Sequence, residues 1–270
     1  MADWWQVLLL GIVEGVTEFL PISSTAHLLI TSQLLGFQHS QGGAFEIAIQ
    51  FGAVLAVIGY YARELGSQAR ALRHDPLTRQ LWLGVAVACL PAMLAGLALR
   101  NVIKAVLFAS PVVIAWALIA GGVVFLLVER RPIRPPATSH LRKVSLRQAF
   151  GIGLVQALAL VPGVSRSGAA IVGGLLAGLD RRTATAFSFY LAIPTLGGAT
   201  LVELWGALSQ LDPLVARDFV LGTLVALVVS WLSIGWLLRY VSAHSFTPFA
   251  IYRILIGLVI LGLHAGGVLR

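Results

Sequence analysis

Long apolar runs separated by short polar segments dominate this chain. Six runs are each close to the roughly 20 residues that a helix needs to cross a bilayer. They lie at about 44–62, 82–100, 109–128, 185–206, 218–238 and 248–268. The pattern predicts six membrane-spanning helices.

Two further stretches, 4–36 and 147–180, are apolar but are broken in the middle by proline and polar residues. The breaks read PISST at 21–25 and PGVSRSG at 162–168. Each half-stretch has only about 12–16 residues, which is too short to cross. Irregular backbone at membrane depth is tolerated only where protein buries it or it lines a wet cavity. We therefore expect two re-entrant helix–turn–helix hairpins, with a proline-kinked full span as the alternative.

The two halves of the chain resemble each other. A shift of 141 residues places Pro21 on Pro162 and Ser24 on Ser165, and a shift of 142 brings the apolar run from Phe45 onto the run that starts at 187. Each half then contains one hairpin followed by three spans. Because three is an odd number of crossings, the second half must be inverted, as in many proteins with binding sites at the membrane midplane.

We accordingly predict a single membrane domain over 1–270. Its inverted-repeat halves are 1–129 and 147–270, joined by a basic cytoplasmic linker at 130–146.

Composition supports the membrane assignment. Hydrophobic residues make up 58% of the 270 and charged residues 11%, against about 25% charged in soluble domains. The fold class is therefore an all-α polytopic membrane protein. The net charge of +8 indicates basic loops that set the orientation in the membrane and attract anionic headgroups. It does not indicate nucleic-acid binding. The single cysteine, Cys89, excludes an intrachain disulfide, and the start of the chain has no basic segment typical of a signal peptide.

The distribution of Lys and Arg predicts the orientation. Most of them fall on the side that carries the loop at 63–79 and the linker, whereas few fall on the side of the two termini. Basic residues concentrate in cytoplasmic loops. We expect both termini on the periplasmic side of a bacterial inner membrane.

Glu14 and Glu18 are the first candidates for chemistry. They are four residues apart, so on a helix they share one face. Two acids in an apolar helix are costly, and intramembrane charges are usually functional. Hard divalent cations such as Mg²⁺ and Ca²⁺ bind carboxylates together with substrate phosphates, which suggests a metal site. The alternative is a peripheral helix on which both acids face water.

The first break supplies Ser23, Ser24, Thr25 and His27. Free backbone N–H groups where a helix restarts favour phosphate oxygens, and a serine near a histidine has the ingredients of an activated nucleophile. The alternative is a set of capping hydroxyls with a hydrogen-bonded interior histidine.

The second break supplies Ser165, Arg166 and Ser167. An arginine in such a place needs an anion, and its planar fork suits phosphate. The alternative partner for Arg166 is Glu14 or Glu18 in an ion pair, which could also exist in the empty site and open when an anion arrives.

Glu46 and Gln50 share a face of the first full span and are weaker candidates for metal or water contacts. Hydrogen bonds between helices would explain them equally well.

Three strings carry a family resemblance: VEGVTEFLPISSTAH at 13–27, FEIAIQFGAVLAV at 45–57 and VPGVSRSG at 161–168. The chain resembles the bacterial undecaprenyl-diphosphate phosphatases, also called bacitracin-resistance proteins, over its whole length. One departure is Ala26, which stands where the family usually has glycine.

The resemblance implies roles for these residues. Glu14 and Glu18 match the acidic pair associated with a divalent cation and diphosphate. Ser24 matches the proposed nucleophile and His27 its acid/base partner, while Arg166, beside Ser165, matches the phosphate-binding arginine. Water attacking directly, without a phosphoserine, remains an alternative.

The implied activity is hydrolysis of undecaprenyl diphosphate to undecaprenyl phosphate and inorganic phosphate on the periplasmic side. This step recycles the lipid carrier for cell-wall synthesis and confers bacitracin resistance. The rival reading is a membrane carrier or flippase for a phosphorylated lipid or anion, since such proteins share inverted repeats and broken helices. The sequence leaves a homodimer open.

Overall fold

The computed structural model describes residues 4–37, 44–102, 110–130, 138–208 and 213–269. Within these ranges the chain is helical, apart from one isolated β-bridge between Thr138 and Leu179. The α-helices are α1 (Trp4–Thr17), α2 (Ser24–Leu35), α3 (Ala44–Tyr60), α4 (Ala62–Ala71), α5 (Pro76–Val102), α6 (Pro111–Glu129), α7 (Leu146–Ala157), α8 (Arg166–Leu176), α9 (Arg181–Leu208), α10 (Pro213–Val241) and α11 (Thr247–Ala265). Two short 3₁₀ turns, η3 (Leu141–Lys143) and η4 (Leu158–Leu160), flank α7.

In the described part of the chain, five helices are long and apolar enough to cross a membrane: α5, α6, α9, α10 and α11. The pair α3 and α4 passes the same criterion as one segment bent by 66°. The prediction of an all-helical protein with about six spans is confirmed.

The segment that we treated as a loop at 63–79 is instead mostly helical. It contains α4 and the first residues of α5. The sequence of α4, ARELGSQARA, is polar with an amphipathic pattern, so it suits a membrane surface better than a span. The loop prediction was wrong because it was based on charge, although most of these residues are good helix formers.

The helices α1, α2, α7 and α8 are the arms of the two expected hairpins. They have 14, 12, 12 and 11 residues. At about 1.5 Å per residue they are about 16–21 Å long, shorter than a hydrocarbon core of about 30 Å. None of the four arms can cross a bilayer alone.

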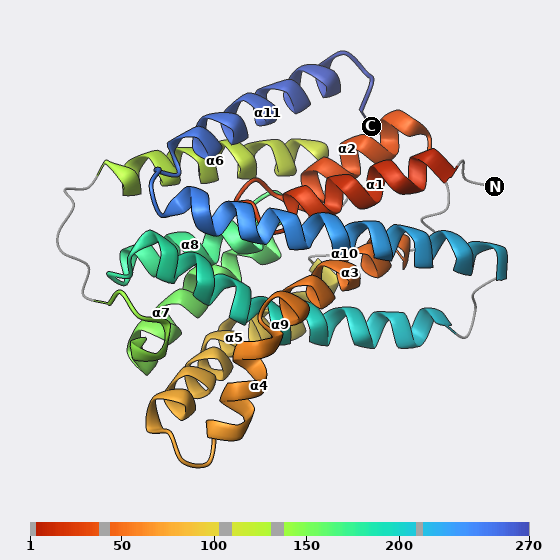
Figure 1. Ribbon diagram of the computed structural model, residues 1–270. Coiled ribbons are helices and arrows are strands. Elements are labelled where there is room, and N and C mark those ends of the chain that lie inside the picture. The colour runs from red at the N-terminus through yellow and green to blue at the C-terminus, as the bar shows by residue number, and fades with distance from the viewer. Residues whose placement is uncertain (1–3, 38–43, 103–109, 131–137, 209–212, 270) are drawn as a thin grey trace.

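The helices pack in pairs that link the two halves. α10 runs through the middle of the bundle and contacts both α1 and α3, while α6 and α11 lie side by side (Figure 1). α7 packs on α5 as α1 packs on α10, and α3 contacts α9. These are the pairs that two related halves would form, although the division into repeats stays a prediction.

The two ends of the bundle differ in what they carry. The start of α1 and the end of α11 lie at one end, and the end of α6 and the start of α7, which flank the linker, lie at the other (Figure 1). The hairpin tips, between α1 and α2 and between α7 and α8, lie between the two ends.

Candidate functional site

Both hairpin tips turn through the same unusual backbone conformation. Ser23 has φ 74° and Ser165 has φ 73°, and they are the only non-glycine residues with positive φ in the described ranges. Each is the residue before its helix, α2 or α8. Such conformations cost about 1–3 kcal/mol each and tend to occur at functional sites. The backbone conformation therefore aligns Ser165 with Ser23, which is a shift of 142 residues between the two halves. The prolines had suggested a shift of 141 residues.

Three of the predicted site residues are joined by hydrogen bonds. The hydroxyl of Ser24, the first residue of α2, donates to Oε2 of Glu18 at 2.5 Å. The other carboxylate oxygen of Glu18 accepts from Arg166, the first residue of α8, at 2.9 Å. The two tips thus meet through a Ser24–Glu18–Arg166 chain, and the ion pair that we considered as the alternative for Arg166 is present.

The guanidinium of Arg166 is held from several sides but keeps one free donor. It donates to the backbone oxygen of Ser188 at 2.8 Å, and it lies 5.7 Å from the centre of the Phe19 ring. Its Nε–H is buried with no hydrogen-bond partner among the described residues. A fixed guanidinium with a spare donor is suited to receive an anion.

Glu14 lies in α1 and is completely buried. Neither of its carboxylate oxygens has a hydrogen-bond partner within the described ranges. A buried, unpartnered carboxylate is expensive, so it needs a cation or a proton. The described residues contain no group of three or more His, Cys, Asp and Glu side chains that could hold a metal. A cation at Glu14 would therefore need ligands from substrate or water, as magnesium commonly has.

The N-termini of α2 and α8 differ in their capping. The Ser165 hydroxyl accepts from the backbone N–H of Gly168 at 3.1 Å, which caps α8. Ser23 makes no such cap on α2. The first amides of a helix lack partners within it, so α2 offers open N–H groups and α8 has one fewer.

Ser165 and Ser167, both predicted to bind phosphate, are engaged with the protein. Ser167 is buried and donates to the backbone oxygen of Leu20 at 3.0 Å, and it lies 3.1 Å from Ser165. These contacts tie one tip to the other. The proposed contacts with phosphate stay predictions, as do those of Ser23 and the half-buried Thr25.

His27 is oriented by neighbours other than Ser24. Its Nδ1 lies 2.7 Å from the backbone oxygen of Ser23, which fixes the proton on Nδ1. Its Nε2 is therefore the acceptor for the hydroxyl of Tyr252, at 2.8 Å. Ser24 has Glu18, and not His27, as its hydrogen-bond partner.

Glu46 and Gln50 lie one turn apart on α3 and are both half-buried. Glu46 is close enough to Glu14 for the two charges to interact. Their part in a metal site stays a prediction.

Arg253 in α11 is a residue of the site that we did not predict. It is fully buried, and it donates to Pro21 of the first tip and to Gly163 and Val164 of the second, at 3.0, 3.0 and 2.9 Å. The sequence did contain the signal, since an arginine within the apolar run 248–268 is an intramembrane charge.

Glycines leave the space that Arg253 occupies. A Cβ at Gly121 would collide with its guanidinium, and one at Gly168 would lie 3.0 Å from it. Gly168 is the counterpart of Ala26 in the backbone register of 142. Ala26 packs in an apolar cluster with Ile114 and Leu118.

Comparison with known proteins gives one consistent family. Residues 7–259 match the family described as bacitracin resistance protein BacA. A protein of Deinococcus radiodurans named undecaprenyl-diphosphatase is 47% identical over 99% of this chain and 98% of its own length. Proteins of Deinococcus deserti and Paraburkholderia xenovorans, named undecaprenyl-diphosphatase and undecaprenyl-diphosphatase 1, are 48% and 47% identical over 99% of this chain, and over 98% and 99% of their own lengths.

Proposed function

This chain belongs to the bacitracin resistance protein BacA family, and we propose that it is an undecaprenyl-diphosphatase. It would hydrolyse undecaprenyl diphosphate to undecaprenyl phosphate and inorganic phosphate. The observation that carries this proposal is the Ser24–Glu18–Arg166 chain, which joins a hydroxyl, a carboxylate and a guanidinium between two buried tips.

Phosphoryl transfer needs mainly positioning and stabilisation of charge. The diphosphate would lie between the tips, with its terminal phosphoryl group on the open N–H groups at the start of α2. Arg166 would contribute its free Nε–H. The isoprenoid tail would remain in the membrane among the spans.

The hydrogen bond from Ser24 to Glu18 supports Glu18 as the group that would receive the proton of Ser24. The Ser24 oxygen would attack the terminal phosphorus while its proton passes to Glu18 and undecaprenyl phosphate leaves. Water then cleaves the phosphoserine and releases inorganic phosphate. A nucleophile and base within hydrogen-bond reach are the usual signature of this chemistry.

His27 keeps a role in this scheme as a proton carrier for the later steps. Its Nε2 is held by Tyr252, so it would act once that hydrogen bond opens. Direct attack by water, with Ser24 only binding phosphate, is the alternative.

The burial of Glu14 supports a divalent cation, Mg²⁺ or Ca²⁺, as its partner. The two unpartnered oxygens of this buried carboxylate are hard ligands of the type these ions prefer. Both oxygens of Glu18 are already engaged, so it would join the cation only after rearrangement. When bound, the cation neutralises charge on the diphosphate.

The decisive experiment measures phosphate release from undecaprenyl diphosphate by the purified protein in detergent. We expect turnover that falls strongly with a chelator and is restored by Mg²⁺ or Ca²⁺. Ser24→Ala should lower it by at least about 10²-fold, since the nucleophile is lost. No phosphate release by the wild type would contradict the enzyme and favour a carrier. Full turnover by Ser24→Ala would favour direct attack by water.

The proposed orientation places both termini in the periplasm and the linker in the cytoplasm, so that the site serves the outer leaflet. Single cysteines test it in a Cys89→Ala background, because Cys89 is the only native cysteine. Ala265→Cys should react with a membrane-impermeant maleimide in intact cells. Ser139→Cys should react only after the cells are opened. The opposite pattern would reverse the orientation.

A further inference from the structure

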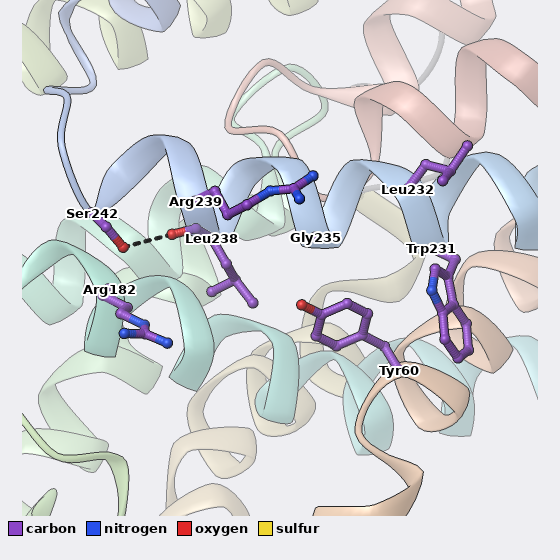
Figure 2. Close-up of a pocket in the computed structure, with 8 residues that line it drawn as sticks. All are labelled: Tyr60, Arg182, Trp231, Leu232, Gly235, Leu238, Arg239 and Ser242. Atoms are coloured by element: carbon purple, nitrogen blue, oxygen red, sulfur yellow. Dashed lines mark hydrogen bonds between the residues drawn. The ribbon is translucent and has the colours of Figure 1, made fainter.

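A basic groove lies apart from the hairpin tips, between α3, α9 and α10. It has a volume of about 530 Å³ and shares no residue with the Ser24–Glu18–Arg166 chain. Its lining residues lie towards the C-terminal ends of α3 and α10 and the start of α9 (Figure 2): Tyr60, Arg182, Trp231, Leu232, Gly235, Leu238, Arg239 and Ser242. This is the end of the bundle that carries the linker (Figure 1).

The groove holds two arginines without a balancing acid. Arg182 and Arg239 are exposed, and neither has an ion pair or hydrogen bond with another described residue. The neighbouring Arg181 differs, because it forms a two-point ion pair with Glu129 at 2.5 and 3.0 Å. One of two adjacent arginines is thus neutralised by the protein, and the other is left for an external anion.

Two polar groups of the groove face each other, and a third lies along α10. Figure 2 shows the guanidinium of Arg182 and the hydroxyl of Tyr60 pointing towards each other across the gap below α10, with Arg239 along that helix. The Tyr60 hydroxyl has no hydrogen-bond partner in the described part of the chain. Two guanidinium forks and a phenol hydroxyl are donors of the kind that phosphate oxygens accept.

The rest of the groove is apolar and faces the surroundings of the bundle. The Tyr60 and Trp231 rings meet edge to face with centroids 5.8 Å apart. Trp231 is 43% exposed and its neighbour Leu232 65%. Tryptophan and tyrosine gather where hydrocarbon meets headgroups. A charged end beside an exposed apolar wall matches a ligand with a phosphate head and an acyl chain.

We propose that this groove binds an anionic phospholipid, with its phosphate on Arg182, Arg239 and Tyr60 and an acyl chain along Trp231 and Leu232. Basic pockets between membrane helices on the cytoplasmic side bind such headgroups. The proposal goes beyond the phosphatase reaction and does not depend on it.

Quenching of Trp231 by brominated lipids tests the site in reconstituted full-length protein. The difference between wild type and Trp231→Phe isolates this residue from the other tryptophans. At equal mole fraction in phosphatidylcholine vesicles, brominated phosphatidylglycerol should quench it more than brominated phosphatidylcholine does. Each arginine should contribute about fivefold to the preference, and the pair about 25-fold. No preference would overturn the proposal.

A matched pair of variants separates the groove from general surface charge. Arg182→Gln/Arg239→Gln should abolish the preference for phosphatidylglycerol. Arg70→Gln/Arg73→Gln removes the same charge from the end of α4 and its following turn, outside the groove, and should keep it. Equal losses in both would mean that bulk charge attracts the lipid, and would overturn the site.

Two further measurements complete the test. Millimolar inorganic phosphate should leave the quenching intact, and full displacement would assign the groove to a free anion instead of a lipid. Native mass spectrometry of the wild type, which needs no change at Trp231, should show phosphatidylglycerol retained more than phosphatidylcholine. Equal retention of the two would count against the proposal.

Discussion

Glu18→Gln should lower the turnover of undecaprenyl diphosphate by about 10²–10³-fold or more, with the fold intact. Glutamine keeps the size of the side chain and one acceptor, but it cannot take the proton of Ser24 or pair with the charge of Arg166. Groups that stabilise charge at a reacting centre are typically worth about 10²–10³-fold each. Initial rates of phosphate release at saturating lipid, together with the melting temperature in detergent, give the measurement.

A second ion pair in the same chain, with a buried carboxylate and a half-buried arginine, supplies the control. Glu129 and Arg181 form an ion pair at the far end of the bundle, so Glu129→Gln breaks a comparable contact away from the tips. We expect a lower melting temperature but turnover within a few-fold of wild type. If both variants lost stability and activity to the same degree, Glu18 would have only a structural role.

Much of the site could be read from the sequence because its residues are consecutive in two short breaks. Ser24 and Arg166 both begin helices that follow a proline-containing break, and local rules identify such positions. The paired acids on α1 were also visible, since intramembrane charge is a local property of the sequence.

The partners of these residues could not be read in the same way. His27 and Glu18 are both near Ser24 along the chain, and only the turn through Ser23 decides which of them its hydroxyl meets. The link from Glu18 to Arg166 spans 148 residues, so it depends on how the helices pack. Helix packing in membranes follows small residues and polar contacts, which a single sequence does not pair up.

Arg253→Met should be the most damaging change outside the reacting groups. The described hydrogen bonds of Arg253 go to neither Ser24 nor Glu18 but to carbonyls of both tips. Methionine fills similar space and leaves those buried carbonyls unpaired, at about 1–3 kcal/mol each. We expect a loss of at least about 3 kcal/mol in stability. Because a displacement of about 1 Å can cost 10²-fold in rate, the folded fraction should also turn over about 10²-fold more slowly.

The value of kcat per folded molecule distinguishes a positioning role of Arg253 from a general loss of folded protein. A tip displaced in the folded protein lowers kcat per folded molecule, whereas partial unfolding lowers only the amount of active enzyme. Arg253→Lys should recover part of both losses, since it keeps the charge but reaches fewer carbonyls. Turnover and melting temperature near wild type in Arg253→Met would show that the tips hold each other without it.

Two glycine variants test whether the position of Arg253 matters for the rate, without removing the arginine. Gly121→Ala places a Cβ against the guanidinium of Arg253, whereas Gly262→Ala on α11 meets nothing within 4 Å. The first should lower kcat in the same direction as Arg253→Met, and the second should leave it unchanged. The guanidinium of Arg253 is hydrogen-bonded to the backbone of both tips, so moving it by the width of a methyl group should shift Ser24 relative to Arg166. A lower kcat would report that shift.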